Sequence, residues 1–260
     1  MLHPDGLVGW VDLMTSDVEA ARAFYSDLFG WTSQDMPTPM GPNYTQFYKD
    51  GKVVAGMGPL PPDMSAAGVP SQWSSYVIVE DLDAALAKVG PAGGQVVMPA
   101  MDVMTQGRMA MVADPSGAVI GLWQPQDHQG AELFNVPGAL TWNELQSRDV
   151  EAARPFYSAV FGWRWEDSGQ PGYWIANLDS KPGEDKSNAG AMGMPEGVPA
   201  EVPSFWGVYF AVSDCDATLA RATELGATVT FPAMEMGPMR FAGITDPTGA
   251  FVMFGALRSA

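Results

Sequence analysis

The hydrophobic pattern of the chain begins with an apolar stretch at residues 8–14, which predicts a β-strand. Ser16 and Glu19, just after this stretch, have the spacing of a helix-capping box. The apolar residues that follow recur at helical spacing, and Gly30 stands where the C-terminal cap of a helix is expected. The pattern therefore predicts a strand and then a helix, with an apolar stripe made of Val18, Ala21, Tyr25, Leu28 and Phe29.

The remaining pattern predicts more elements of the same kinds. Residues 44–48 and 52–56 predict two strands joined by a tight turn at Asp50-Gly51, and the proline-rich residues 57–72 predict a connector. A strand, a helix and three strands then follow at residues 74–79, 82–89, 95–98, 108–113 and 118–123. Further along, we expect strands at 138–146, 206–212 and 250–255, helices from Asp149 and Asp216, and a connector at 192–203.

These elements recur because the sequence itself is duplicated. Residues 17–31 return at residues 149–163 with twelve of fifteen positions identical. The same offset of 132 residues relates Trp10 to Trp142, Arg108 to Arg240, and the Asp-Pro-Ser-Gly-Ala of residues 114–118 to the Asp-Pro-Thr-Gly-Ala of residues 246–250. A match of this length at a fixed offset indicates an internal repeat. We therefore expect one domain at residues 1–125, a linker at 126–137 and a second domain at 138–260.

Composition narrows the classes of partner. The chain has 13 basic and 30 acidic residues, and its formal net charge of −17 opposes binding to nucleic acid and to anionic membrane surfaces. It also lacks an apolar run of membrane-spanning length. The first residues do not have the basic and apolar regions of a secretory signal, and the single cysteine, Cys215, cannot form an internal disulfide. These features favour a cytoplasmic protein.

The motifs of the two halves resemble those of a known superfamily. Each half has a strand followed by Asp-x-x-x-Ala-x-x-Phe-Tyr-x-x-x-x-Gly-Trp, and each closes with Asp-Pro-x-Gly-Ala. The pair resembles the vicinal oxygen chelate superfamily of glyoxalases, bleomycin-resistance proteins and extradiol dioxygenases, and is similar to its two-domain glyoxalase-like members from actinobacteria. The resemblance implies an α+β fold of tandem duplicated glyoxalase-like domains, in which four βαβββ modules pair into two open, curled-sheet cups.

The resemblance also indicates where a metal would be bound. Metal-dependent members carry ligands on the first and last strands, facing the cup, and divalent metals there need imidazole or carboxylate groups. The matching positions, with looser equivalents in the second modules, hold Trp10, Gly121, Trp142, Met253, Ser74 and Gly207. His3 and His128 lie outside the predicted cup strands. We therefore expect no metal and no cofactor in either half.

Strand alternation predicts the side chains that face each cup. The first cup would combine the carboxylate of Asp12 with ligand-binding residues Trp10, Tyr76 and Trp123, and the second would combine Glu144 with Trp142, Gln146, Tyr209 and Met253. Aromatic walls with one carboxylate suit a flat organic ligand held by ring contacts. The alternative is that the large rings only fill the space that metal and substrate occupy in other members.

Two carboxylates are candidates for catalysis. Asp12 and Glu144 would sit in apolar surroundings, where a carboxyl group can titrate nearer neutrality and act as an acid or base. Arg108 and Arg240 lie on neighbouring strands and are candidates either to bind a ligand or to pair with these carboxylates.

The function expected from these features is the binding of a small aromatic or electrophilic organic molecule in a metal-free cup, for detoxification or resistance. An alternative is a lyase or isomerase of the lactoylglutathione lyase type that uses Glu144 or Asp12 as its base, with or without a metal. A third is that one half is only a scaffold, because the halves differ within the cups, with Gly121 against Met253 and Asp12 against Glu144. The partner would be a small organic molecule, and the protein a monomer or homodimer.

Overall fold

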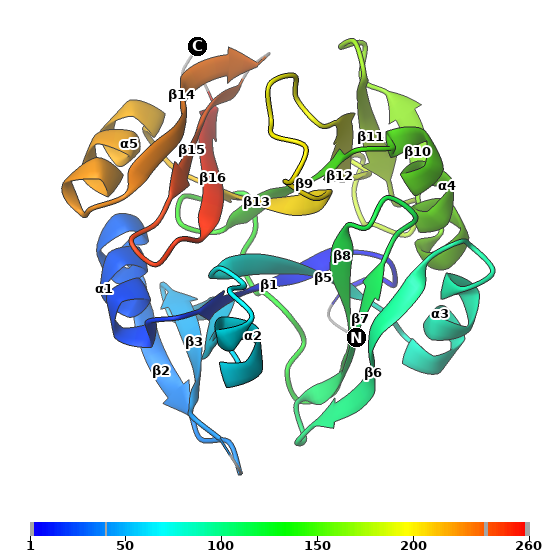
Figure 1. Cartoon of the computed structure of the whole chain (residues 1–260), viewed down its shortest axis with the longest axis horizontal. Helices are drawn as coiled ribbons and strands as arrows, with labels where there is room; N and C mark the ends of the chain where they lie inside the picture. Colours follow the sequence, from blue (N-terminus) through cyan, green and yellow to red (C-terminus); the bar gives the residue numbers. More distant parts are fainter. Residues whose placement is uncertain (1–2, 40, 237–238, 258–260) are drawn as a thin grey trace. The chain divides into compact units, whose positions relative to one another are not determined.

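The computed structural model describes residues 3–39, 41–236 and 239–257 (Figure 1). The elements of the first half are β1 (Val8–Thr15), α1 (Val18–Phe29), β2 (Thr32–Met36), β3 (Tyr44–Lys49), β4 (Lys52–Pro59), α2 (Pro62–Ala66), β5 (Gln72–Ile78), α3 (Leu82–Val89), β6 (Gln95–Val103), β7 (Gly107–Ala113) and β8 (Val119–Pro125). No helix in these residues or in the rest of the described chain is both long and apolar enough to cross a membrane.

The second half repeats this order. Its elements are β9 (Leu140–Ser147), α4 (Val150–Phe161), β10 (Arg164–Asp167), β11 (Tyr173–Asn177), β12 (Ser187–Gly193), β13 (Phe205–Ala211), α5 (Cys215–Glu224), β14 (Thr228–Met236), β15 (Met239–Thr245) and β16 (Phe251–Leu257). Each half therefore contains two βαβββ modules. Modules 1 and 2 begin at β1 and β5, and modules 3 and 4 begin at β9 and β13.

The strands of each half form one mixed sheet. The first sheet has the order β2-β3-β4-β1-β5-β8-β7-β6, and the second has the order β10-β11-β12-β9-β13-β16-β15-β14. The first and last strands of each module pair in parallel, as β1 does with β4 and β5 does with β8, whereas the neighbouring meander strands pair antiparallel. Both sheets stay open at their edges. The α+β fold with four βαβββ modules, expected from the repeated motifs, is confirmed.

Contacts between Cα atoms divide the chain into two compact units that combine modules from different halves. Unit 1 consists of residues up to Trp10, Ser75–Gly130 and Trp142–Gly207, and so holds most of modules 2 and 3. Unit 2 consists of Val11–Ser74, Ala131–Thr141 and the residues from Val208 on, and holds most of modules 1 and 4. The two modules of one half thus share a sheet, whereas each compact unit combines a module of the first half with a module of the second half. The domain boundaries at residues 125 and 138 stay a prediction.

The core of unit 1 is built where α3 packs on α4. The buried Tyr157 hydroxyl donates a hydrogen bond to Asp114 Oδ2 over 2.8 Å and accepts one from Trp206 Nε1 over 2.8 Å. Asp114 Oδ1 also accepts from the backbone amides of Ser116 and Ala118. Burial, and then the charge of Asp114, raise the pKa of Tyr157, so its phenol stays protonated and remains a donor.

Unit 2 contains the same arrangement, in a core where α1 packs on α5. Tyr25 donates to Asp246 Oδ2 over 2.7 Å and accepts from Trp73 Nε1 over 2.9 Å. The Tyr of one half therefore binds the Asp-Pro-x-Gly aspartate of the other half, once in each unit. This pairing gives the repeated Phe-Tyr and Asp-Pro-x-Gly motifs a structural role, in agreement with the expectation that these tyrosines are core residues.

Helix ends are set by aspartates rather than by the predicted capping box. Asp17, not Ser16, is the N-cap of α1, and its carboxylate accepts a hydrogen bond from the Ala20 amide over 3.0 Å. The Ser16 amide instead donates to Ser71 Oγ over 3.0 Å, because the chain leaves β1 beside the start of β5. The prediction that Gly30 ends this helix is confirmed, since its φ of 66° is left-handed.

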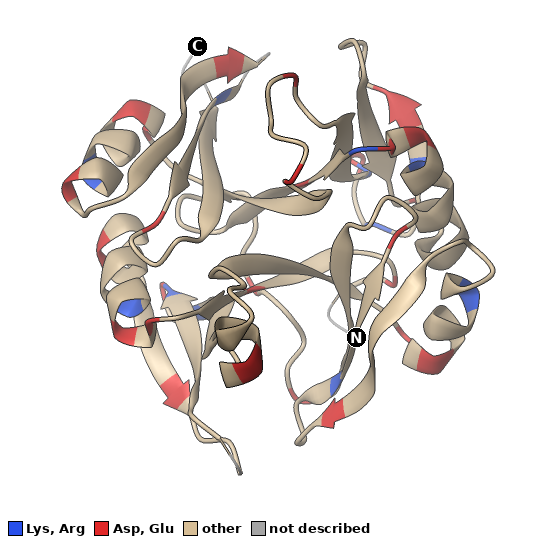
Figure 2. Ribbon diagram, in the orientation of Figure 1, with Lys and Arg blue, Asp and Glu red and all other residues tan. Residues whose placement is uncertain are grey.

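The sequence pattern missed mainly polar and irregular elements. The edge strands β2 (sequence TSQDM) and β10 (sequence RWED) are largely exposed, so neither has the apolar alternation that marks a strand. In Figure 2, acidic and basic residues within each unit lie mainly on the helices and on edge strands, while most of the central strands are uncharged. The helix α2 lies inside the predicted connector 57–72.

Candidate functional site

In unit 1, the strand β9 presents a polar row on the side of the sheet that faces away from the helices. Leu145 packs in the core of unit 1. Its neighbours Glu144 and Gln146 therefore point to the opposite face, and Trp142 precedes them on that face, as predicted from alternation. Glu144 is 2% exposed and Gln146 is 4% exposed, whereas Trp142 is half-buried.

A chain of hydrogen bonds joins this row to a tyrosine on β11. Trp142 Nε1 donates to the Tyr173 hydroxyl over 2.8 Å, and that hydroxyl is hydrogen-bonded to Glu144. Gln146 Nε2 donates to Glu144 Oε1 over 3.2 Å. Because Tyr173 and Trp142 are half-buried while the carboxylate lies beneath them, a molecule approaching this face meets the indole and the phenol first.

The phenol of Tyr173 is held in its protonated form. Burial raises its pKa, the charge of Glu144 raises it further, and the hydrogen bond from Trp142 opposes these effects. The protonated hydroxyl can therefore serve Glu144 as a donor at neutral pH. Gly190 makes the arrangement possible, since an added Cβ there would lie 2.1 Å from the Tyr173 hydroxyl and 2.8 Å from Trp142 Nε1. Sequence reasoning missed Tyr173 because its strand was not predicted.

Unit 2 holds a simpler version of the carboxylate and tyrosine pair. The Tyr44 hydroxyl, on β3, donates to Asp12 Oδ2 over 3.2 Å, and Asp12 is 7% exposed. Asp12 lies beside Gly56 on the parallel strand β4, as Glu144 lies beside Gly190 on β12. The two predicted catalytic carboxylates thus each have a tyrosine partner from the third strand of their module.

The first half also contributes an aromatic cluster to unit 1. The imidazole of His128 packs edge-on against Trp10, with ring centroids 4.3 Å apart, and lies 5.5 Å from the Trp123 ring. Trp123 Nε1 donates to the His128 backbone carbonyl over 2.9 Å. The sequence placed His128 in the linker and outside the cup strands, and gave no signal that the linker returns to these two tryptophans.

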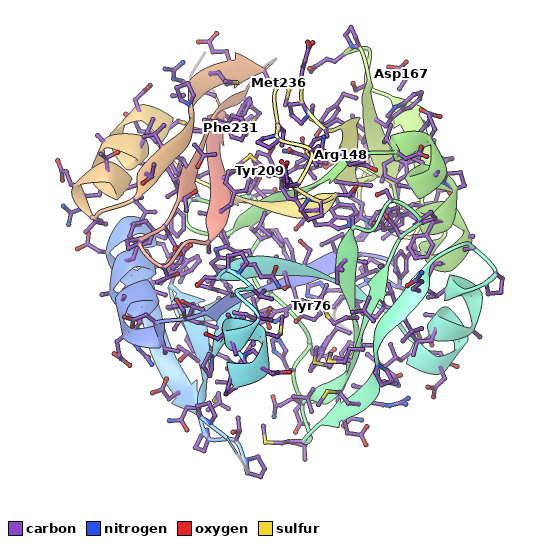
Figure 3. All side chains as sticks on the ribbon, in the orientation of Figure 1. Tyr76, Arg148, Asp167, Tyr209, Phe231 and Met236 are labelled. Atoms are coloured by element: carbon purple, nitrogen blue, oxygen red, sulfur yellow. The ribbon has the colours of Figure 1, made fainter. Side chains whose placement is uncertain are left out.

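Tyr76 and Tyr209, which were also predicted to face the cups, lie beside the last-strand positions that carry metal ligands in metal-dependent members of the superfamily. In unit 1, Tyr76 pairs in register with Gly121, and its ring occupies the space above that glycine, where an added Cβ would lie 2.1 Å away. In unit 2, Tyr209 pairs with Met253 and lies 6.4 Å from the Phe241 ring. Tyr76 and Tyr209 are labelled in Figure 3. Both tyrosines are buried, which suits the expectation that rings fill part of each cup.

The expectation that Arg108 and Arg240 pair with Asp12 or Glu144 is wrong. Arg108 forms two hydrogen bonds with Asp83, of 3.0 and 3.1 Å, and Arg240 forms two with Asp216, of 2.7 and 2.8 Å. These aspartates lie in the first turns of α3 and α5, so both arginines extend toward a helix. The same hydrogen bonds lower the pKa of both aspartates. Any role of the two arginines in ligand binding stays a prediction.

The residues at the expected metal positions do not fit a metal ion. They offer two indoles, two glycines, a thioether and a hydroxyl, and the space at Gly121 is filled by the ring of Tyr76. Among residues 3–39, 41–236 and 239–257, no three His, Cys, Asp or Glu side chains group so as to hold a metal ion.

Comparison with known proteins agrees with this fold. A family model described as Glyoxalase/Bleomycin resistance protein/Dioxygenase superfamily matches residues 7–122 and 139–254. The chain is 42% identical to the protein of Mycobacterium bovis named "Putative glyoxylase CFP32", over 99% of this chain and 97% of that protein. It is 38% identical to "Anthracycline biosynthesis protein DnrV" of Streptomyces peucetius, over 94% of this chain and 91% of that protein.

Solved structures show the same architecture. The Mn(II)-bound glyoxalase from Novosphingobium aromaticivorans matches with a TM-score of 0.66 and 16% identity, over 98% of this chain and 83% of that chain. The 2,2',3-trihydroxybiphenyl 1,2-dioxygenase from Sphingomonas wittichii matches with a TM-score of 0.62 and 14% identity, over 97% and 91%. Identities this low establish a shared fold and leave the chemistry to the residues of each site.

Proposed function

We propose that this chain, which belongs to the Glyoxalase/Bleomycin resistance protein/Dioxygenase superfamily, binds a flat aromatic organic molecule against Trp142 and Tyr173. The superfamily expected from the repeated motifs is confirmed, because both halves match it. Members of one superfold carry out many reactions, so the function has to be argued from the site.

The observation that carries the proposal is the hydrogen-bonded row of Trp142, Tyr173, Glu144 and Gln146. Its two half-buried aromatic groups offer flat apolar contact area, and its buried carboxylate has a fixed position behind them. An arrangement of this kind favours a ligand that combines a planar ring system with a hydroxyl group, because the rings gain contact area and the hydroxyl can bind Glu144 or Tyr173.

The names of two relatives suggest the size of such a ligand. DnrV, and DauV of Streptomyces sp. strain C5, are both named as anthracycline biosynthesis proteins. Anthracyclines contain a fused-ring chromophore that carries phenolic oxygens, which is the chemistry this row favours. We infer a role in metal-free binding of such a molecule, for protection, resistance or detoxification. The unsuitable side chains at the expected metal positions support the metal-free part of this inference.

The direct test is to titrate 1,4-dihydroxyanthraquinone into the protein and into its Glu144→Gln variant. A hydrogen bond to a charged group contributes about 1.5–3 kcal/mol, so we expect Glu144→Gln to weaken binding roughly tenfold or more. Quenching of tryptophan fluorescence and isothermal titration calorimetry would measure the dissociation constant. Glu184→Gln, which makes the same change at an exposed position, is the matched control and should bind as tightly as the unchanged protein.

Two outcomes would count against the proposal. Failure of the unchanged protein to bind any planar hydroxylated ring compound would remove the proposed ligand class. Equal affinity of the unchanged protein and Glu144→Gln would show that the carboxylate does not orient the ligand, and would leave the row as a structural feature.

A second candidate is an enzyme, a lyase or isomerase in which Glu144 is the base. The observation that favours it is the protonated Tyr173 hydroxyl bonded to Glu144, because a carboxylate and a phenol in contact can accept and return a proton. Incubation with the bound ring compound, followed by mass spectrometry and chromatography of isomers, detects turnover. Loss of turnover in Glu144→Gln with binding retained would support the enzyme. Unchanged turnover would exclude Glu144 as the base.

A further inference from the structure

Arg148 follows directly after β9 and binds only neutral backbone groups. Its guanidinium donates to the carbonyl of Val202, over 3.2 Å from Nε and 2.9 Å from Nη2, and to the carbonyls of Val198, over 3.5 Å, and Pro199. Its own amide donates to Ser204 Oγ over 2.9 Å. One side chain thereby fixes residues 198–202 of the connector between β12 and β13, all within unit 1.

This set of partners is unusual for the chain. In the described part of the protein, Arg148 has no carboxylate within ion-pair distance, although the chain has 30 acidic residues. The other arginines that the structure describes each pair with an aspartate or glutamate; they are Arg22, Arg108, Arg154, Arg164, Arg221 and Arg240. Arg148 is also exposed, so its guanidinium is open to a carboxylate from outside the chain.

The position of Arg148 relates it to the row on β9. The backbone of Ser147 continues the strand, pairing with Gly193 and accepting a hydrogen bond from the Met194 amide. Arg148 is the first residue after β9 and follows Gln146 by two positions, so it lies at the end of the strand that carries Gln146 and Glu144. The labels of Figure 3 mark Arg148 at the end of this strand. The equivalent residue of the first half is Ser16, which carries no charge.

We propose that Arg148 is the binding residue for a carboxylate on the ligand, so that the second-half site takes aromatic carboxylic acids. This assignment rests on the proposed function, since it names the ligand class of the same row. A planar guanidinium binds a carboxylate through two parallel hydrogen bonds, a geometry that adds specificity as well as energy.

Binding would exchange one set of partners for another. The ligand carboxylate replaces the carbonyls of Val198, Pro199 and Val202 at the guanidinium, so residues 198–202 lose the side chain that fixes them. The carboxylate is thus recognised through an arginine whose present partners are neutral. The net charge of −17 repels anions in general, so an anionic ligand needs a cation such as Arg148 at its binding site.

The experiment compares anthraquinone-2-carboxylate with anthraquinone-2-carboxamide, which has the same shape and no charge. We expect the unchanged protein to bind the carboxylate about tenfold to a hundredfold more tightly than the amide. Arg148→Gln should remove this preference while keeping the affinity for the amide. Arg164→Gln, which removes an exposed cation of unit 1 that pairs with Glu166, is the matched control and should keep the preference.

Hydrogen exchange measured by mass spectrometry gives a second result on the unchanged protein. Saturation with the carboxylate should speed amide exchange in residues 198–202, whereas saturation with the amide should leave it unaltered. This measurement needs no variant, so a folding defect in Arg148→Gln would not hide the answer.

The outcomes separate the two proposals. If both compounds bind equally to the unchanged protein, the assignment of Arg148 is wrong and the proposed function stands. If Arg148→Gln keeps the preference for the carboxylate, another group recognises it and the assignment is again wrong. If neither compound binds, the assignment of Arg148 is wrong, and the titration with 1,4-dihydroxyanthraquinone decides separately whether the proposed function stands.

Discussion

The rows at the ends of the two duplicated first strands have diverged, although their surroundings are similar. β9 carries a carboxylate and an amide and is followed by a guanidinium, whereas β1 carries a carboxylate and a thioether and is followed by a hydroxyl. The residues compared are Trp142, Glu144 and Gln146 on β9 with Arg148 just after it, and Trp10, Asp12 and Met14 on β1 with Ser16 just after it. In unit 1, Glu144 is bonded to Gln146 and Tyr173, which gives the second half the more elaborate polar network.

The cores of the two units show the opposite behaviour. In unit 1, Tyr157 binds Asp114, and in unit 2, Tyr25 binds Asp246, with a tryptophan donating to each hydroxyl. The two hydrogen bonds between tyrosine and aspartate differ by only 0.1 Å in length. The duplication has therefore kept the contacts that hold modules together and changed those on the open face of each sheet. We infer that the open face, and above all the row on β9, is where the function differs.

The largest expected effect is the loss of either buried aspartate. Asp114→Ala removes the acceptor of the Tyr157 hydroxyl and of two backbone amides, and should lower the free energy of unfolding by about 3–5 kcal/mol. Asp246→Ala should have a similar effect, because its contacts are the same. Urea unfolding followed by tryptophan fluorescence measures both changes.

The reactivity of the single cysteine, Cys215, indicates which unit each substitution destabilises. Burial raises the pKa of Cys215, in unit 2, to about 11, so its thiol is protonated and slow to react at pH 8. Asp246→Ala, in the same unit, should speed labelling of this thiol by iodoacetamide more than Asp114→Ala does. Losses below about 1 kcal/mol in both variants would contradict the view that these contacts hold the modules together.

A smaller effect is expected from filling the glycine beside Glu144. In Gly190→Ala the new Cβ would lie 2.1 Å from the Tyr173 hydroxyl, so the ring must move away from Glu144 and Trp142. We expect a loss of about 2–3 kcal/mol, together with weaker ligand binding. Gly193→Ala, on the same strand with no atom within 4 Å of an added Cβ, is the matched control and should be nearly neutral in a thermal unfolding scan. Equal stability of the two variants would mean that the Tyr173 ring is free to shift.

Much of the fold could be predicted from the sequence because it depends on local signals. The helical stripe, the left-handed cap at Gly30 and the turn at Asp50-Gly51 were all predicted, and both turn residues have the positive φ values that such a turn requires. Because the sequence is duplicated, the same predictions applied to the second half. The pairing of modules 2 and 3, and of modules 1 and 4, could not be found in this way, since it depends on contacts between residues far apart in the chain.

The candidate site was predicted only where alternation along one strand was enough. Glu144, Gln146 and Trp142 were identified from a single strand, whereas Tyr173 lies on a strand with no recognised pattern. The partners of Arg108 were missed for a related reason: whether an arginine extends toward a helix or toward the cup depends on which charges the fold brings near it. Here Asp83, in the first turn of α3, is the nearer partner.

The smallest prediction compares the two tyrosines that contact the carboxylates. Tyr173→Phe removes the hydroxyl that binds the buried Glu144 and leaves Trp142 Nε1 without its acceptor, so we expect a loss of about 2 kcal/mol. Tyr44→Phe removes a single bond of 3.2 Å to Asp12 and should cost about 1 kcal/mol. Urea unfolding of both variants resolves this difference. Equal losses would mean that the two tyrosine–carboxylate contacts contribute equally to stability. The two halves would then not differ at Glu144 and Asp12. The expected inequality would instead indicate that the second half has the more strongly organised site, which is where the binding of a planar ligand has been proposed.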